Sequence, residues 1–205
     1  MGNDAVFDNL VGFYEVTDAN GGIDTDGDGV ADLMPGDAGY ARAAIANRVD
    51  NFSIRAGSSG DPTLNTTVEQ FGDVILAGGR RFAPFVIANG GGLGFDGFIA
   101  AEDAEGDGVF NDAADFSEDQ VVYFSFVGAN PDGVAHLQSR GNNVFGFEDL
   151  PNNIFSDMDF NDAIFSFSFG ASNIFSDMDF NDGIFSDMDF TDAIFSDMDF
   201  TDAII

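Results

Sequence analysis

Apolar and polar residues alternate along much of this chain, in the period of two that is typical of strands with one buried face. The clearest run is 163–169, where Phe165, Phe167 and Phe169 alternate with serines. Other segments that predict strands, wholly or in part, are 5–16, 51–56, 67–76, the start of 80–94, 121–127 and 134–138. We therefore predict an all-β chain.

One segment has a helical pattern instead. Residues 37–49 are rich in alanine and place Tyr40 and Ile45 at a spacing that suits one face of a helix. Asp37 stands at the start of this segment, and aspartate is a favoured N-cap residue. The sequence Asn-Pro-Asp-Gly at 130–133 predicts a turn between two strands. The pattern thus predicts one short helix among strands.

The amino-acid composition excludes several classes of partner and site. The 205 residues include 37 Asp and Glu but 6 Lys and Arg, which gives a formal net charge of −31. Such a charge excludes nucleic acid and anionic membrane surfaces as partners. The apolar runs are shorter than the roughly 20 residues of a membrane span, so we expect no membrane insertion. The chain has no cysteine for disulfides or thiolate metal sites, and its first residues lack the pattern of a signal peptide.

Three acidic segments have the residue types of calcium sites. In the first, the spacing from residue 24 follows an EF-hand loop, with carboxylates at positions 1, 3, 5 and 9, glycine at 6 and a backbone carbonyl at 7. The candidate ligands are Asp24, Asp26, Asp28, Val30 and Asp32. Position 12, where a bidentate glutamate belongs, is Pro35, so Asp37 would have to replace it. The alternative is a solvated acidic turn.

The second segment, 103–112, repeats the pattern. Its candidate ligands are Asp103, Glu105, Asp107, Val109 and Asn111, with Gly108 at position 6. It also lacks the closing glutamate, and the alternative is a solvated hairpin loop.

The third segment, 148–162, is a run of oxygen-bearing side chains without any Lys, Arg or His. Hard oxygen ligands with no internal cation are the set that Ca²⁺ prefers. The candidate ligands are Glu148, Asp149, Asp157, Asp159, Asn161 and Asp162. The alternative for all three segments is a solubilising surface, but the acidic residues directly precede apolar strands, where Asp and Asn are unfavourable.

The end of the chain repeats this last motif. The unit IFSDMDFND occurs at 154–162 and 174–182, and IFSDMDFTD at 184–192 and 194–202. We divide the chain into a calcium-binding domain at 1–170 and a low-complexity repeat tail at 171–205. The later copies leave three residues for each strand, which favours a poorly specified tail over a calcium-bound solenoid. A further hypothesis, motivated by these repeats, is that the chain has no evolved function.

Four stretches carry a family resemblance: FDNLVGFYEV (7–16), LMPGDAGYARAAI (33–45), VYFSFVGANPDGVAH (122–136) and FGFEDLPNNIFSDMDFNDAIFSF (145–167). They resemble the bacterial domain-of-unknown-function family number 4114, found near the C-termini of large secreted and surface proteins. The DTDGDGVAD insertion and the repeated tail depart from that family. The resemblance implies an antiparallel, jelly-roll-like β-sandwich and an extracellular or cell-surface location. It also implies a possible enzymatic use of the acidic motifs, from Glu148 to Asp162.

These observations lead to three hypotheses about the function of the chain. The first is a non-catalytic module whose Ca²⁺ ions stabilise the acidic loops. The second is a carbohydrate-binding or adhesive module, with an extracellular polysaccharide or another surface protein as partner. The third is a glycan hydrolase that uses Glu148 and Asp159, although the chain has no Trp to form a sugar platform. The single His136 has no visible Ser or Cys nucleophile beside it, which favours a structural role.

Overall fold

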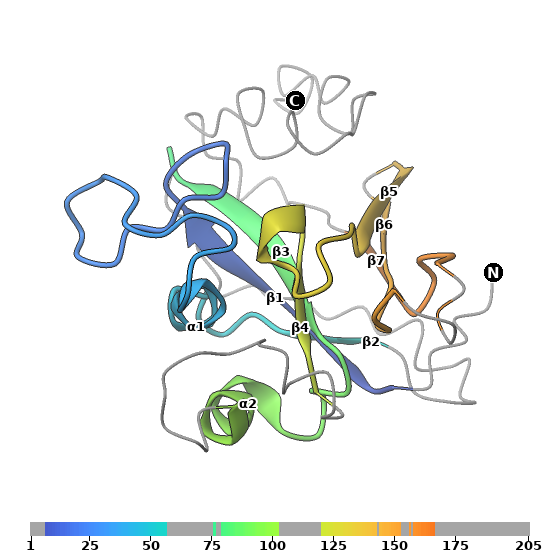
Figure 1. The fold of residues 1–205 in the computed structure, drawn as a ribbon. Helices are drawn as coiled ribbons and strands as arrows, with labels where there is room; N and C mark the ends of the chain where they lie inside the picture. Colours follow the sequence, from blue (N-terminus) through green and yellow to red (C-terminus); the bar gives the residue numbers. More distant parts are fainter. Residues whose placement is uncertain are drawn as a thin grey trace, which may run out of the picture.

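The computed structural model describes residues 7–56, 76, 79–102, 120–142, 144–152, 156 and 158–166. These residues form strands that are joined by loops and three short helical elements (Figure 1). The elements in chain order are β1 (Asn9–Val16), α1 (Tyr40–Ala46), β2 (Ile54–Ala56), β3 (Arg81–Ile87), α2 (Gly94–Glu102), β4 (Val122–Phe124), the 3-10 helix η3 (Val127–Ala129), β5 (Leu137–Gly141), β6 (Val144–Phe147) and β7 (Ala163–Ser166).

The strands make two antiparallel sheets. One has four strands in the order β2-β1-β3-β4, and the other has three in the order β5-β6-β7. The longest pairing joins β1 to β3, from Leu10 opposite Ile87 to Val16 opposite Arg81. The all-β prediction is confirmed to this extent: the regular structure is mostly strands, in two antiparallel sheets.

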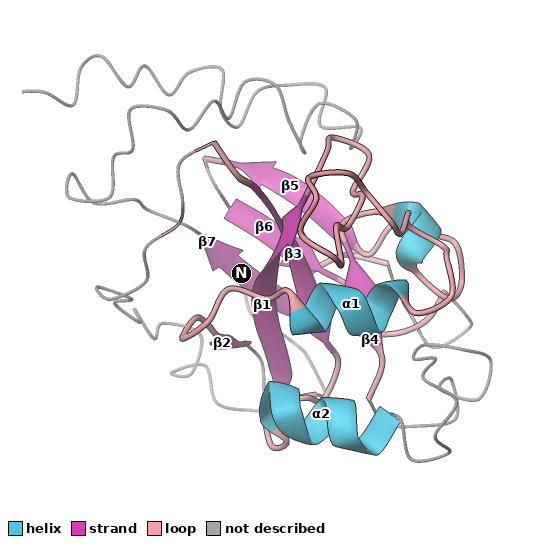
Figure 2. Cartoon of the chain, turned by 90° about the vertical axis from the view of Figure 1, so that its left-hand side faces the viewer, coloured by secondary structure: helices cyan, strands magenta, loops and turns pink. Residues whose placement is uncertain are grey.

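The four-stranded sheet is buried on both faces. Along its strands, alternate residues enter two different hydrophobic clusters, as the two-residue period of a strand requires. On one face, Tyr14, Phe85 and Phe124 pack with residues of α1 and α2. On the other face, Val86 and Tyr123 share a cluster with residues of the three-stranded sheet. Figure 2 shows the two helices beside the four-stranded sheet.

The three-stranded sheet contributes phenylalanines to that shared cluster. The ring of Phe165 stacks on Phe145 and on Phe147, with centroids 5.7 and 5.8 Å apart. Gly146 lies between these two phenylalanines of β6 and under the turn at 158–162. A Cβ atom at this position would collide with the carbonyl oxygen of Phe160. Glycine at this position therefore allows the acidic turn to lie against the strand.

Some predicted elements differ from the structure. The second helix, α2, was not predicted, because its sequence follows a run of glycines that reads as a loop. The predicted strand 134–138 begins only at Leu137, and β6 was not predicted as a separate strand. The Asn-Pro-Asp-Gly turn is confirmed by a 3.0 Å bond from the Gly133 amide to the Asn130 carbonyl. Apart from residue 76, the predicted strand 67–76 lies outside the described residues.

The N-cap prediction for α1 is wrong. The cap residue is Gly39, in a left-handed conformation with φ 83°, and no side chain caps the helix. Asp37 instead accepts a 2.8 Å hydrogen bond from the Met34 amide through its carboxylate. In the part of the chain that is described, no helix is long and apolar enough to cross a membrane.

The aromatic cluster on the helix-covered face generates a stability prediction. Phe124 is fully buried, and its ring lies 5.7 Å from those of Tyr14 and Tyr40. We expect Phe124→Ala to lower the free energy of unfolding by about 3–5 kcal/mol, because it removes apolar contacts and leaves a cavity. Urea denaturation measures this. Val127→Ala, at a side chain 44% exposed, is the matched control, and an equal loss in both variants would contradict the packing described here.

Candidate functional site

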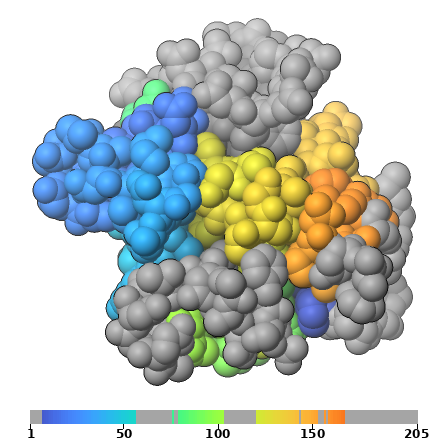
Figure 3. Space-filling view, viewed as in Figure 1, coloured from blue at the N-terminus to red at the C-terminus, as the bar shows by residue number. Residues whose placement is uncertain are grey.

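The first acidic segment forms a loop that is closed at its base by a short antiparallel bridge between Ile23 and Leu33. The Ile23 amide donates to the Leu33 carbonyl at 2.9 Å, and the Asp32 amide donates to the Ile23 carbonyl at 2.8 Å. Ile23 is fully buried, whereas residues 25–30 are all exposed. The loop therefore projects from a fixed base, and it stands out at the left of Figures 1 and 3.

Within this loop the carboxylates fold back onto the backbone. Asp24 accepts hydrogen bonds from the amides of Gly27 and Gly29, both at 2.7 Å. Asp26 accepts from the amide of Asp28 at 3.1 Å, and Asp28 in turn accepts from that of Val30 at 2.8 Å. Both glycines have φ near 85°, a left-handed conformation that glycine adopts without strain. The local sequence thus wraps the backbone around its own carboxylates.

As a result, three predicted ligands converge. One carboxylate oxygen from each of Asp24, Asp26 and Asp28 lies within 4.8 Å of the others. No other group of three carboxylate or imidazole side chains in the described residues meets this criterion. Asp32 is not a member of this group; its carboxylate accepts hydrogen bonds from the Thr25 amide and hydroxyl at 2.8 and 2.7 Å. Val30 is 65% exposed on the loop.

These hydrogen bonds favour the ionised acids. The amides of Gly29 and Gly27 lower the pKa of Asp24 below its ordinary value, and the Thr25 hydroxyl and amide lower that of Asp32. At neutral pH the loop is therefore a set of anionic oxygens with no thiolate and no imidazole, which is the donor set of a hard cation.

Two buried tyrosines tie the base of the loop to the core. The Tyr40 hydroxyl donates to the Gly21 carbonyl at 2.6 Å. Tyr14 and Tyr40 hydroxyls lie 2.9 Å apart, and because the Tyr40 hydrogen is used on Gly21, Tyr14 must be the donor. Burial raises the pKa of both phenols, so both stay protonated. The strand β1 and helix α1 thus position the loop through one chain of hydrogen bonds.

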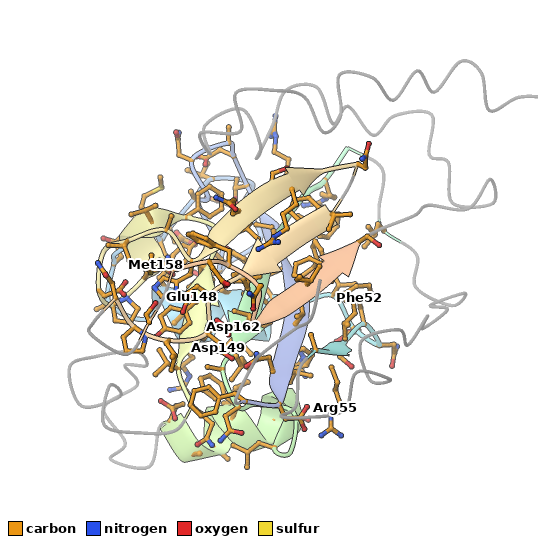
Figure 4. The ribbon with its side chains drawn as sticks, turned by 90° about the vertical axis from the view of Figure 1, so that its right-hand side faces the viewer. Phe52, Arg55, Glu148, Asp149, Met158 and Asp162 are labelled. Carbon is orange, nitrogen blue, oxygen red and sulfur yellow. The ribbon has the colours of Figure 1, made fainter. Side chains whose placement is uncertain are left out.

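The third acidic segment begins where β6 ends. Here Asp132, Glu148, Asp149 and Asp162 form what we call the buried acidic cluster; Glu148 and Asp149 are 1% and 2% exposed. The Asp149 amide donates to the Asp162 carboxylate at 3.0 Å. The labelled side chains of Glu148, Asp149 and Asp162 lie in the same part of the molecule in Figure 4. The structure thus brings three of the predicted ligands together, but not as one group of converging carboxylates.

The other predicted ligands of this segment have different positions. Asp159 is exposed, and its carboxylate accepts a 3.1 Å hydrogen bond from the Asn161 amide and a further one from the Asn161 side chain. Met158 and Phe160, on either side of Asp159, both have positive φ, so the turn is sharply folded. Asp157 lies outside the described residues, as do the whole second segment (Asp103, Glu105, Asp107, Val109, Asn111) and the tail at 171–205.

Sequence reasoning did not place Asp132, His136 or Asn9 at this cluster. The fully buried His136 ring has the Glu148 carbonyl 2.9 Å from Nδ1 and the Asp132 carboxylate 3.0 Å from Nε2. Both of its nitrogens are therefore engaged in the structure, which suits the predicted structural role. Asn9 of β1 donates to the Asp149 carboxylate at 2.7 Å. No local pattern links residues 140 positions apart.

Tyr123 covers the cluster from the four-stranded sheet. Its ring stacks on His136 with centroids 3.7 Å apart. Burial raises the pKa of its hydroxyl, and the negative charges of Asp132, Asp149 and Glu148 raise it further. The phenol thus faces several carboxylates and stays protonated.

Comparison with known proteins finds a match to one family. Residues 76–170 match the family model described as Domain of unknown function (DUF4114). This segment of the chain belongs to that family. The DUF4114 segment includes the strands from β3 to β7 and the buried acidic cluster, whereas β1, α1 and the loop at 24–32 lie before it. Searches of the curated proteins and of the solved structures found no match.

The contact between the Asp132 carboxylate and the His136 ring generates a prediction on pH. Burial opposes ionisation of Asp132, but the His136 ring and the amides of Asn152 and Val134 outweigh it and lower the pKa below the ordinary 3.8. An acid whose pKa is lower in the folded state stabilises the fold above its unfolded pKa, and this contribution is lost as the pH falls through the folded value. We therefore expect Asp132→Asn to lower stability at neutral pH, and the deficit to shrink below pH 3.8.

Urea unfolding of the wild type and of Asp132→Asn across this pH range measures the deficit. Asp50→Asn, at an exposed position, is the control for removing one negative charge. A deficit for Asp132→Asn that stays constant down to the lowest pH would show that the charge on Asp132 plays no part.

Proposed function

We propose that the chain is a non-catalytic, calcium-binding β module of an extracellular or cell-surface protein. The observation that supports this most strongly is the convergence of Asp24, Asp26 and Asp28 within 4.8 Å. Three anions at this separation repel one another, and the amides of Gly29 and Gly27 lower the pKa of Asp24. A divalent cation among the three would turn this repulsion into attraction.

The donor set favours Ca²⁺ over other metals. The loop offers carboxylate and carbonyl oxygens, and it is exposed, so water can complete the coordination. Ca²⁺ accepts six to eight such oxygens in flexible geometry, whereas Mg²⁺ requires a stricter octahedron and the later transition metals prefer nitrogen and sulfur ligands. Position 12 remains Pro35, and Asp37 is engaged with the Met34 amide. An affinity in the range of extracellular modules suits a loop that lacks the bidentate glutamate.

The exposure of the loop also supports a second candidate function, that of a carbohydrate-binding or adhesive module. A cation held by three carboxylates on an exposed loop has positions left for external oxygens, such as sugar hydroxyls or a carboxylate of another surface protein. Binding to a glycan array that EDTA abolishes would favour this function over a purely structural role of the ion.

The geometry favours the calcium-binding module and the carbohydrate-binding or adhesive module over a glycan hydrolase. Glu148 is 1% exposed, and its Oε1 accepts a 2.8 Å hydrogen bond from Ser156. Asp159, the proposed second carboxylate, is exposed on the adjacent turn. A general acid must reach the glycosidic oxygen, and this glutamate is enclosed by its own domain. Turnover of a polysaccharide that Glu148→Gln abolishes would reverse this preference.

We expect Ca²⁺ to raise the melting temperature of the full chain in proportion to the logarithm of its concentration, relative to EDTA, because it binds the folded state. In Asp26→Asn/Asp28→Asn, each amide oxygen can still accept the backbone hydrogen bond, but two charges are removed. We expect this variant to bind Ca²⁺ at the loop at least about tenfold more weakly, since affinity follows the ligand charge count.

Differential scanning calorimetry and isothermal titration calorimetry measure the two effects. Mg²⁺ is the ion control and Asp50→Asn the charge control. Identical calcium titrations for the wild type and the double variant would exclude the loop as a calcium site.

A further inference from the structure

Inside the DUF4114 segment, the polar side-chain atoms that are shielded from solvent and have no hydrogen-bond partner include Glu148 Oε2, Asn161 Oδ1 and Tyr123 Oη. Glu148 and Tyr123 are 1% and 0% exposed as whole residues. A buried carboxylate oxygen without a donor or a cation is strongly unfavourable. Such an atom in a folded protein therefore indicates a missing partner.

The strand register places Glu148 opposite Asp162. In the β6–β7 pairing, Phe147 stands opposite Ala163. One residue further along each strand, Glu148 and Asp162 follow, and then Asp149 and Asn161. The hydrogen bond from the Asp149 amide to Asp162 shows that the two chains stay together beyond the last strand pair. Tyr123 borders the cluster from the other sheet, because its ring stacks on His136, which hydrogen-bonds the Glu148 carbonyl and the Asp132 carboxylate.

The chemistry of the missing partner follows from the charges. The buried acidic cluster contains four carboxylates, and the Glu148 side chain receives one donor, the Ser156 hydroxyl on its other oxygen. Arg140 approaches the same turn, but its Nη2 donates to the backbone carbonyls of Asp159 and Phe160, at 2.6 and 2.9 Å. A water molecule could donate to Glu148 Oε2, but it would leave the charge uncompensated. An orphaned carboxylate oxygen beside further carboxylates fits a hard divalent cation.

We propose that Glu148, with Asp162 opposite it, holds a second, buried Ca²⁺ ion, and that this ion clamps the β6–β7 pair to the four-stranded sheet. The inference rests on the proposed function, calcium binding by the chain, but it assigns a different site with a different role. The Asp149 carboxylate accepts from Asn9 of β1, so the cluster is already joined to the central sheet. The ion at Glu148 fixes the end of the β6–β7 pair at this junction, whereas the ion at residues 24–28 orders an exposed loop.

The test uses Tb³⁺, which replaces Ca²⁺ at oxygen sites and emits light when a nearby tyrosine absorbs. The chain has three tyrosines and no tryptophan. Tyr14 and Tyr40 lie at the base of the exposed loop, and Tyr123 lies at the buried acidic cluster, so each site has its own sensitiser. In the Asp26→Asn/Asp28→Asn background, we expect tyrosine-sensitised Tb³⁺ emission that Ca²⁺ displaces and that Tyr123→Phe removes.

Glu148→Gln tests the ligand itself. We expect it to weaken this Tb³⁺ and Ca²⁺ site at least about tenfold. It should also raise the melting temperature in EDTA and lower it in saturating Ca²⁺, because it replaces an uncompensated buried charge by a neutral amide. Glu15→Gln, which removes an exposed glutamate paired with Arg80, is the control and should not show this reversal. A structural role without an ion predicts the same sign of change with and without Ca²⁺.

The outcomes separate the two proposals. Emission that the loop variant abolishes and Glu148→Gln leaves unchanged overturns the buried site, while the calcium function of the loop stands. Emission that survives in the loop variant and disappears with Tyr123→Phe establishes the buried site, whatever happens at the loop. Should Glu148→Gln fail to fold, the Tyr123→Phe comparison decides alone. Absence of Ca²⁺-competed emission in the wild type and in every variant overturns both proposals.

Discussion

A carboxylate that is withdrawn from water must be compensated, and in this chain that constraint acts most strongly at Glu148. The sequence FGFEDL places two acids directly after a strand whose phenylalanines are buried, so burial of Phe145 and Phe147 carries Glu148 and Asp149 inward with them. The protein supplies some compensation, through Asn9 to the Asp149 carboxylate and through Ser156 to that of Glu148. Each of these partners comes from a different element, and the acids therefore join parts of the fold that are distant in sequence.

The two acidic regions differ in what a cation would do. At 24–28 the carboxylates are exposed, so water screens their repulsion and the empty loop can persist with a modest cost. At Glu148 the same charge is shielded from solvent, and leaving it uncompensated is expensive. An ion in the loop would chiefly order a surface, whereas an ion at Glu148 would add to the stability of the whole fold. The same chemistry thus has a local consequence in one place and a global one in the other.

Much of the fold could be predicted because it depends on local patterns. The period of two at 5–16 and at 163–169 led to β1 and β7, and helical spacing led to α1. The loop at 24–32 was predicted in detail, since an EF-hand-like loop is built from contacts among neighbouring residues, such as Asp24 with Gly29. In contrast, α2 follows glycines whose pattern indicates a loop, and the sequence offers no cap to mark where the helix begins.

What could not be predicted depends on contacts between distant residues. Asp132 belongs to a turn sequence, and its proximity to Glu148 follows only once β5 pairs with β6 and His136 bridges the two acids. Asp32 also stands outside the converging group, and its carboxylate is hydrogen-bonded to Thr25. Spacing in a sequence identifies candidate ligands, but the geometry of the folded chain decides which of them converge.

The position of Asn9 bears on the extent of the structural unit. The DUF4114 match begins at residue 76, yet β3 pairs along its length with β1, which lies some sixty residues before that point. A segment that began at residue 76 would leave one edge of β3 unpaired and expose the apolar residues that β1 covers. It would also remove the Asn9 side chain that holds Asp149. The packing therefore requires β1 as a central strand of the unit that contains the acidic cluster, and the fold extends beyond the segment by which its family is identified.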